Sequence, residues 1–276
     1  MQLCDLHIHS VYSDGTDTPA QILALAETKG LSAVALTDHN TTAGLPDFLD
    51  AAKNHSVEVI PGAEFSVDWE GTELHLLGLF LPPTAFAPLE AMMEQVHRRK
   101  EESNLYMIQM LAQDGYVLDY EKIKAAAVGH INRFHIAQAL TDAGYAPSKD
   151  DAFAMLAKGG RYYREPERIR ALDMIGHIRL LGGVPVLAHP LLNLSPEQLG
   201  RFLPLAKQAG MAGMECLYSE YDPAQTRLSF DLAQQFDLLP SGGSDYHGTA
   251  KTHIQLGSGT GSLQIPYRFA QDLKRA

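Results

Sequence analysis

Five short segments of the chain combine histidine or acidic side chains at or near the end of a run of apolar residues. The segments are Asp5–Ser10 with Asp14 close behind, Thr37–Asn40, Pro61–Glu64, Ala188–Pro190 and Gly243–His247. A further histidine, His75, lies inside an apolar run. Mixed imidazole and carboxylate ligands suit zinc, manganese, iron(II) or cobalt rather than calcium or magnesium. The residue types therefore predict a site for divalent transition metals.

The spacing of two segments places pairs of side chains on one face of a strand. His7 and His9 are two residues apart, and so are Asp245 and His247. Side chains alternate along a strand, so both members of each pair point the same way. A single histidine near a strand end is more often a hydrogen-bonded structural residue, but this many segments together favour a metal site.

Short apolar runs alternate with helical patterns in both halves of the chain. Strands are predicted at 3–8, 33–36, 57–60, 74–80, 184–187 and 214–218, with a last one before Ser241; helices are predicted at 18–29, 45–53, 165–182, 196–208 and 223–236. This alternation is typical of a mostly parallel sheet covered by helices. The number of units favours a closed α/β barrel, in which catalytic side chains come from the strand ends.

Residues 86–164 break this alternation, because they carry four helical patterns and no strand pattern. We expect a barrel formed by residues 1–85 and 165–276 and an all-helical insertion formed by 86–164. Within the insertion, Asn132, Arg133 and His135 fall at the predicted first turn of a helix, where backbone N–H groups and an arginine can bind an anion. A solvated helix start with a surface arginine is the alternative.

The composition of the chain limits the classes of substrate and indicates a compartment. Asp and Glu outnumber Lys and Arg by 33 to 22, giving a net charge of −11, whereas proteins that grip long nucleic acids usually carry a basic patch. The charge of a phosphate substrate must then be met locally, as bound cations can do. No leader-like or membrane-spanning apolar run is present, and Cys4 and Cys216 fit buried thiols. We expect a cytoplasmic protein with no membrane partner and no signal for a stable protein partner.

The ordered series His-x-His, Thr-Asp-His, Gly-Ala-Glu, Ala-His-Pro and Gly-Ser-Asp-Tyr-His resembles the motifs of the PHP (polymerase and histidinol phosphatase) family and extends from residue 5 to residue 247. The resemblance implies an α/β fold, a distorted seven-stranded TIM-like barrel. It also implies two or three divalent cations, with manganese first and zinc or iron as alternatives. Within the family, the chain is most similar to the branch of 3′,5′-nucleotide bisphosphate phosphatases and RNase AM-type 5′–3′ exoribonucleases.

The resemblance assigns a metal-binding role to nine residues. One cation would be held by His7, His9 and Asp245, a second by His75 and His189 with Glu64 as the bridge, and a third by Asp14, His39 and His247. Position 14 is histidine in some relatives. Asp38 would orient a ligand imidazole, with direct ligation as the alternative. Proton transfer by His189 or Asp245 is also open, because the sequence does not separate that role from ligation.

Substrate contacts are expected from both parts of the chain. In the related phosphatases an Arg-x-His segment grips a second phosphate, which implies that role for Arg133 and His135. Tyr162 is a candidate for stacking on a base, although it fits a core position equally well. Tyr218 lies at the end of a predicted strand and would line the pocket.

These observations predict a metal-dependent phosphoesterase acting on a nucleotide. Two close cations sharing a water lower its pKa and create a hydroxide nucleophile. The first expectation is hydrolysis of a 3′,5′-nucleotide bisphosphate such as pAp to the nucleoside 5′-monophosphate and phosphate. The alternatives are a 5′–3′ exoribonuclease on short RNA and a histidinol phosphatase. A non-catalytic PHP module is the hypothesis from a different class, and it would lack ligands.

Overall fold

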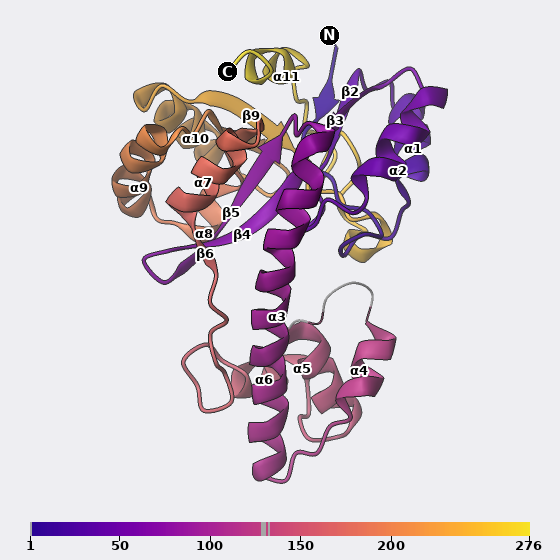
Figure 1. The fold of residues 1–276 in the computed structure, drawn as a ribbon, viewed down its shortest axis with the longest axis vertical. Coiled ribbons are helices and arrows are strands. Elements are labelled where there is room, and N and C mark those ends of the chain that lie inside the picture. Colours follow the sequence, from indigo (N-terminus) through magenta and orange to yellow (C-terminus); the bar gives the residue numbers. More distant parts are fainter. Residues whose placement is uncertain (1, 128–130, 132) are drawn as a thin grey trace. The chain divides into compact units, whose positions relative to one another are not determined.

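The computed structural model describes residues 2–127, 131 and 133–276. These residues form two units, shown in Figure 1: the barrel unit, up to Glu90 and again from Ile169 to Ala276, and the helical unit, Ala91–Arg168. The strands of the barrel unit are β1 (Cys4–Asp5), β2 (Ala33–Leu36), β3 (Glu58–Pro61), β4 (Ala63–Trp69), β5 (Thr72–Leu79), β6 (Ile169–Arg170), β7 (Val184–Leu187), β8 (Gly213–Tyr218) and β9 (Leu239–Gly243).

The helices cover the strands on the outside of the barrel unit. They are α1 (Pro19–Thr28), α2 (Leu45–Ala51), α7 (Ala171–Leu180), α8 (Pro190–Asn193), α9 (Pro196–Ala209), α10 (Pro223–Gln235) and α11 (Arg268–Leu273), with 3₁₀ turns η1 (Ala52–Asn54) and η2 (Gly248–Lys251). The long helix α3 (Pro83–Gln113) begins in this unit and continues into the helical unit. None of the helices in the described ranges combines the length and apolar character needed to cross a membrane.

Two sheets make up the strand layer. One has the order β1-β2-β3 and the other the order β6-β4-β5-β7-β8-β9. β5 pairs antiparallel with both β4 and β7, and the remaining pairs are parallel. β2 and β7 are buried along their whole length, as expected for parallel strands covered on both faces.

Backbone hydrogen bonds outside these ladders join the two sheets into a closed ring. At one junction the N–H of Leu6, just after β1, donates to the carbonyl of Gly242 in β9 of the other sheet at 3.2 Å. At the second junction the N–H of Asn40 donates to the Glu64 carbonyl (2.7 Å), and the Glu64 N–H donates to the Asp38 carbonyl (3.1 Å). The two sheets therefore form a distorted α/β barrel, as the sequence predicts.

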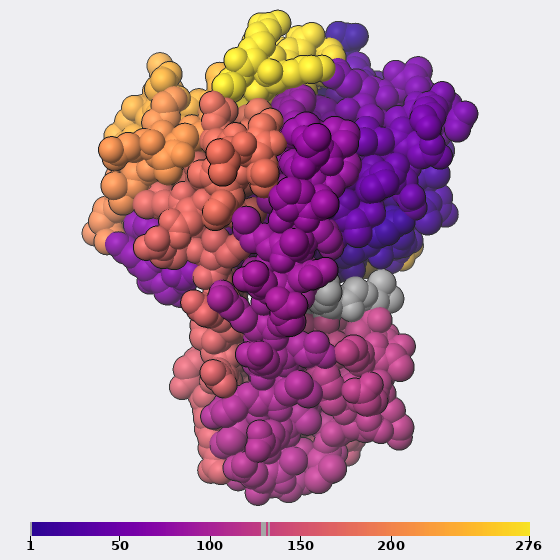
Figure 2. Space-filling view, in the orientation of Figure 1, coloured from indigo at the N-terminus to yellow at the C-terminus, as the bar shows by residue number. Residues whose placement is uncertain are grey.

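The ends of the barrel unit's chain lie together. The N–H of Tyr267 donates to the carbonyl of Gln2 at 3.0 Å, and the N–H of Cys4 donates to the carbonyl of Ile265 at 2.9 Å. Figure 2 shows the C-terminal segment, in yellow, beside the indigo N-terminal end on the surface of this unit. Phe269 of this C-terminal segment packs into the apolar core cluster of the barrel unit.

The helical unit has its own apolar core. After α3 it contains α4 (Tyr120–Ala126), α5 (Arg133–Asp142) and α6 (Lys149–Met155). Met107 and Leu111 of α3 pack in one cluster with Ile136, Leu140 and Leu156. This cluster is separate from the core of the barrel unit, so each unit is stabilised by its own buried apolar surface.

Three elements differ from the prediction. The helix predicted from residue 165 begins at Ala171, because Ile169–Arg170 pair with β4 as a short strand. The first strand is only Cys4–Asp5, since the chain beyond it contacts β9 by single bonds instead of a regular ladder. Strand β4 was not predicted, although Ala63–Trp69 alternates apolar and polar residues from Phe65 onward as a half-buried strand does.

Candidate metal centre

All nine predicted metal ligands lie together at one end of the barrel. His7 and His9 follow β1, His39 follows β2, and Glu64 and His75 lie within the antiparallel pair β4–β5. Four groups of ligand atoms lie within 4.8 Å of one another: His9, Asp14, His39 and His247; His7, His9 and Asp245; His7, Glu64 and His189; and His39, Glu64 and His75. The strand ends thus bring together residues that are far apart in the sequence, as the barrel architecture predicts.

Glu64 lies at the centre of this arrangement. Its Oε2 atom lies 2.9 Å from His39 Nδ1 and 3.2 Å from His7 Nε2. Its Oε1 atom lies 2.9 Å from His75 Nδ1 and 3.0 Å from His189 Nε2. The two oxygens of one fully buried carboxylate therefore face two different groups of imidazoles, which is the geometry of a ligand that bridges two cations.

Several buried atoms in this cluster make no hydrogen bond among the described residues. They are Nε2 of His7, both ring nitrogens of His9, Nδ1 of His39 and Oε2 of Glu64. Buried polar atoms in native proteins are almost always hydrogen-bonded, because an unpaired one costs the free energy of its lost hydration. Convergent imidazole and carboxylate lone pairs are the donor set of a divalent transition metal. The residues present therefore fit the metal centre that the sequence predicts.

In the metal-free protein, the histidines and carboxylates of the cluster shift one another's pKa values. Burial favours the neutral form of His75, but the Glu64 carboxylate outweighs burial and raises the pKa of His75 to about 10. Burial and the neighbouring His247 and His39 lower the pKa of His9 to about 3. Burial favours the protonated form of Glu64, but the surrounding imidazoles dominate and hold its pKa well below the usual range.

A second carboxylate that the sequence analysis missed fixes two of these histidines. Glu215 is fully buried in β8, and its Oε1 lies 3.0 Å from Nδ1 of His7. Its Oε2 accepts the backbone N–H of His189 at 2.7 Å. Such a partner fixes the tautomer and the orientation of a metal-binding imidazole. The available signal was an acidic residue inside the otherwise apolar strand Gly213–Tyr218.

One carboxylate oxygen of Asp245 is hydrogen-bonded to neighbouring side chains, and the other faces the histidine cluster. Its Oδ2 accepts the hydroxyl of Tyr218 at 2.9 Å and pairs with the ammonium of Lys251 at 2.7 Å. Its Oδ1 lies 3.1 Å from Nε2 of His9. The predicted pocket residue Tyr218 is thus 5% exposed and engaged with a candidate ligand, and Lys251 is a further site residue that no sequence pattern indicated.

Asp38 stabilises the loop that carries Asp14 through hydrogen bonds. The Asp38 carboxylate accepts the N–H of Ser10 at 2.7 Å and the hydroxyl of Ser13 at 2.6 Å. Among the described residues the side-chain hydrogen bonds of Asp38 go to this loop, so the proposed contact of Asp38 to a ligand imidazole stays a prediction. Asp14 itself is half exposed and lies 3.3 Å from Nε2 of His247.

Backbone strain is concentrated beside the candidate ligands. His189 (φ 25°), Asp245 (φ 57°) and Asn40 (φ 50°) all have positive φ, which non-glycine residues seldom adopt. Each lies just beyond a strand end, where the chain must turn to point a side chain inward. Strain of this kind persists only where surrounding contacts enforce it and is concentrated at functional sites.

The predicted substrate contacts in the helical unit have partners within that unit. The guanidinium of Arg133 donates to the carbonyl of Leu156 at 3.3 Å and lies 5.1 Å from the ring centroid of Tyr163. The hydroxyl of Tyr162 donates to Asp114 at 2.7 Å. His135 is partly buried in the first turn of α5. Asn132 lies outside the described residues.

Comparison with known proteins identifies the family. The model of the PHP domain family matches residues 5–165. A 5′–3′ exoribonuclease of Haemophilus influenzae is 31% identical, covering 88% of this chain and 89% of the relative. A phosphoribosyl 1,2-cyclic phosphate 1,2-diphosphodiesterase of Eggerthella lenta is 32% identical over 88% of this chain and 94% of its own.

Two further matches connect the chain to phosphoesterases. A 3′,5′-nucleoside bisphosphate phosphatase of Chromobacterium violaceum is 28% identical, covering 88% of this chain and 86% of the relative. A crystal structure from Bifidobacterium adolescentis, described as a metal-dependent phosphoesterase, has 29% identity and a TM-score of 0.79, covering 100% of this chain and 96% of that one. The protein belongs to the PHP domain family and is a metal-dependent phosphoesterase.

Proposed function

We propose that the protein hydrolyses a phosphate monoester of a small nucleotide, with a 3′,5′-nucleoside bisphosphate such as pAp as the preferred substrate. The products are the nucleoside 5′-monophosphate and inorganic phosphate. The observation that carries this proposal is the cluster of imidazoles around the buried Glu64, whose unpaired atoms suit cations that can bind a phosphate. The similarity to a bisphosphate phosphatase supports the choice of substrate.

We assign the three cation sites as the resemblance implies, with Glu64 as the bridge and manganese as the first candidate. When bound, the cations supply a water of lowered pKa and positive charge for the phosphoryl oxygens. Water attacks phosphorus, the bond from phosphorus to the 3′ oxygen breaks, and that oxygen takes up a proton. His189 and Asp245 stay the candidates for proton transfer.

The protein's own side chains prepare the centre for this reaction. Glu215 holds the ring of His7 and the backbone of His189, so their Nε2 atoms face the cation sites. Tyr218 and Lys251 occupy one oxygen of Asp245 and leave the other free to bind. Positioning of this kind removes the cost of reorganising the ligands during the reaction.

The second phosphate of the substrate would be bound by residues of the helical unit. We keep Arg133, His135 and Asn132 in this role and Tyr162 as a candidate contact to the base. The guanidinium of Arg133 is partly buried against Tyr163, which limits its rotamers and would favour a defined phosphate contact. We also propose the cytoplasm as the compartment, which two free, buried cysteines support.

The second candidate function is removal of nucleotides from the 5′ end of short RNA. The observation that favours it is the 31% identity to a 5′–3′ exoribonuclease over most of both chains. The same centre would then cleave a phosphodiester bond. The acidic composition of the chain argues for short RNA ends over long polymers.

Initial rates on a panel of substrates test the proposal. Manganese-loaded protein is assayed with pAp, AMP, histidinol phosphate, phosphoribosyl 1,2-cyclic phosphate and a short 5′-phosphorylated RNA. The proposal requires faster phosphate release from pAp than from AMP, and loss of that preference in Arg133→Ala. Arg161→Ala, an exposed arginine of the same unit paired with Asp114, is the matched control. Preference for any other member of the panel contradicts the assignment.

A further inference from the structure

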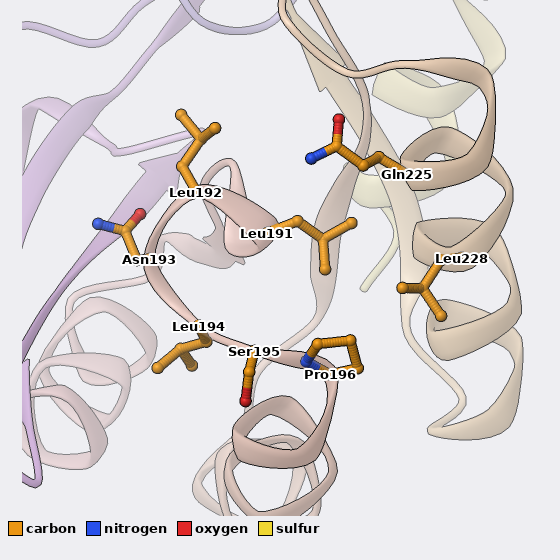
Figure 3. Close-up of a pocket in the computed structure, with 8 residues that line it drawn as sticks. All are labelled: Leu191, Leu192, Asn193, Leu194, Ser195, Pro196, Gln225 and Leu228. Carbon is orange, nitrogen blue, oxygen red and sulfur yellow. The ribbon is translucent and has the colours of Figure 1, made fainter.

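A pocket of about 410 Å³ opens beside the metal centre in the barrel unit. Figure 3 shows its walls: α8 and the turn after it, the start of α9, and the first turns of α10. Eight residues line it, namely Leu191, Leu192, Asn193, Leu194, Ser195, Pro196, Gln225 and Leu228. These segments follow β7 and β8, so the pocket lies at the same end of the barrel as the candidate ligands.

The lining selects against charged groups. None of the eight residues carries a charge, and four are leucines. The side chains of Leu191 and Leu228 point toward one another across the pocket, and the amide of Gln225 enters from α10 (Figure 3). The Gln225 oxygen accepts the N–H of Asp222 at 3.0 Å, and its amide nitrogen makes no hydrogen bond among the described residues. Apolar walls with amide donors such as that of Gln225 suit an uncharged group that carries acceptors, and they do not suit a phosphate.

The walls of the pocket are fixed before any ligand binds. Ser195 and Gln198 form a capping box at the start of α9, and Asp222 and Gln225 form another at the start of α10. The hydroxyl of Tyr221 accepts the N–H of Leu191 at 2.9 Å, which ties the α8 turn to the loop after β8. A preformed site loses less conformational entropy on binding than a mobile one.

One side chain connects the pocket to the metal centre. Asn193 is among the lining residues, and its Oδ1 lies 3.2 Å from Nδ1 of His189. The other nitrogen of that ring, Nε2, lies 3.0 Å from Glu64 Oε1. The lining of the pocket is therefore in direct contact with a candidate ligand of the metal centre.

We propose that this pocket is the subsite for the nucleoside part of the substrate, its base and sugar. The inference rests on the proposed function, because it takes the bound phosphate to be a nucleotide phosphate. It assigns base recognition to the barrel unit in place of Tyr162, with Gln225 as the hydrogen-bond donor and the leucines as the apolar walls. Phosphate recognition stays with the cations and the basic residues.

Two variants test the pocket, and the first has a matched control. Leu228→Trp fills it, whereas Leu205→Trp adds the same ring at an exposed leucine of α9 outside the lining. Gln225→Glu keeps the acceptor that caps α10 but removes the amide donor. Circular dichroism melting curves show that each variant is folded. Tyr162→Ala is included to test whether the base binds in the helical unit instead.

Two measurements are made on every variant. The first is steady-state hydrolysis of pAp and of ribose 3,5-bisphosphate, which lacks a base, by the manganese-loaded protein. The second is saturation-transfer NMR from metal-free protein to adenosine, which reports binding without catalysis. We expect Leu228→Trp to raise KM for pAp by at least about tenfold with kcat little changed, a loss of about 1.4 kcal/mol of binding. Its rate on ribose 3,5-bisphosphate stays that of the wild type, and its saturation transfer to adenosine is lost.

The outcomes separate this inference from the proposed function. If the wild type hydrolyses pAp and Leu228→Trp has the same KM as Leu205→Trp, the pocket is not the nucleoside subsite. A rise in KM for Tyr162→Ala alone overturns the inference in favour of the helical unit. If pAp is not hydrolysed but adenosine binding is present and lost in Leu228→Trp, the proposed reaction fails while the nucleoside site stands. Gln225→Glu is expected to raise KM several-fold, and an unchanged KM would exclude its role as donor.

Discussion

The buried carboxylate of Glu215 joins two candidate ligands that come from different strands. It lies 3.0 Å from the His7 ring nitrogen that faces away from the metal centre, and it accepts the backbone N–H of His189. A buried carboxylate without these two partners would cost folding free energy, so Glu215, His7 and His189 stabilise one another's positions. The orientation of two imidazoles at the centre therefore depends on a residue that binds no cation itself.

The first prediction concerns this support. Glu215→Ala should weaken metal binding by about 10- to 100-fold, because His7 loses the partner that fixes its tautomer. Glu215→Gln, which keeps one acceptor, should recover part of the loss. Isothermal titration of the metal-free variants with Mn²⁺ measures the effect. Wild-type affinity in both variants, with the fold intact, would show that Glu215 has no influence on the centre.

The second prediction concerns the bridging carboxylate. Glu64→Gln should lower the number of bound metal ions per protein, because Glu64 belongs to two of the four ligand groups. Glu70→Gln, at an exposed position in the turn between β4 and β5, is the control and should bind as the wild type does. Metal content after dialysis, measured by mass spectrometry, decides between them. Full metal content in Glu64→Gln would exclude the bridge.

The third prediction concerns pH. In the metal-free protein the pKa values of His7, His39 and His75 are raised, against the effect of burial, by Glu64 and other carboxylates. The raised pKa values favour the protonated rings, and a cation must displace those protons to bind. Metal binding should release protons, and the apparent affinity should fall as pH is lowered. Titration calorimetry in buffers of different ionisation enthalpy counts the protons, and zero release contradicts the charge assignment.

The fourth prediction separates two contacts to the same oxygen of Asp245. The Tyr218 hydroxyl is buried, so Tyr218→Phe should lower the free energy of unfolding by about 2 kcal/mol, as expected for a hydrogen bond to a charged group. The Lys251 ammonium is partly exposed, so Lys251→Gln should cost less than about 1 kcal/mol. Urea denaturation of the metal-free protein tests this order. The reverse order would mean that Lys251 carries the carboxylate's stabilisation.

The fifth prediction concerns the close approach of β9 to His7. A Cβ atom at Gly243 would lie 2.1 Å from the Cβ of His7, so Gly243→Ala forces the two segments apart. It should destabilise the fold by about 3 kcal/mol or more, in the upper range for overpacking. Gly176→Ala in α7, where a Cβ meets nothing within 4 Å, should stabilise it by about 0.5–1 kcal/mol. Thermal melting of both variants provides the comparison.

Much of the site could be predicted because its residues recur at strand ends in fixed order. The His-x-His pair at His7 and His9 needs only the alternation of a strand to place both rings on one side. Glu215 could not be predicted in the same way, because its role depends on the pairing of β8 with β7 and on the turn at His189. Long-range register of this kind leaves no local pattern.

The fold, like the site, has parts that the sequence predicts and parts that it does not. Buried parallel strands such as β2 and β7 are continuous apolar runs and are visible in the sequence. The pair β4–β5 was harder, since β4 follows β3 after a single residue and its polar positions, including Glu64, resemble a loop. Lys251 lies in a 3₁₀ turn with no periodic pattern, so only the folded chain shows that it reaches Asp245.

The most direct test of the central claim is phosphate release from pAp by wild type and Glu64→Gln, each measured after chelation of all metal and again after Mn²⁺ is restored. The account predicts that the metal-free wild type is inactive, that Mn²⁺ restores its activity, and that Glu64→Gln stays far below it at every metal concentration. Equal activity of the metal-free and manganese-loaded wild type, or full activity of Glu64→Gln, would contradict it.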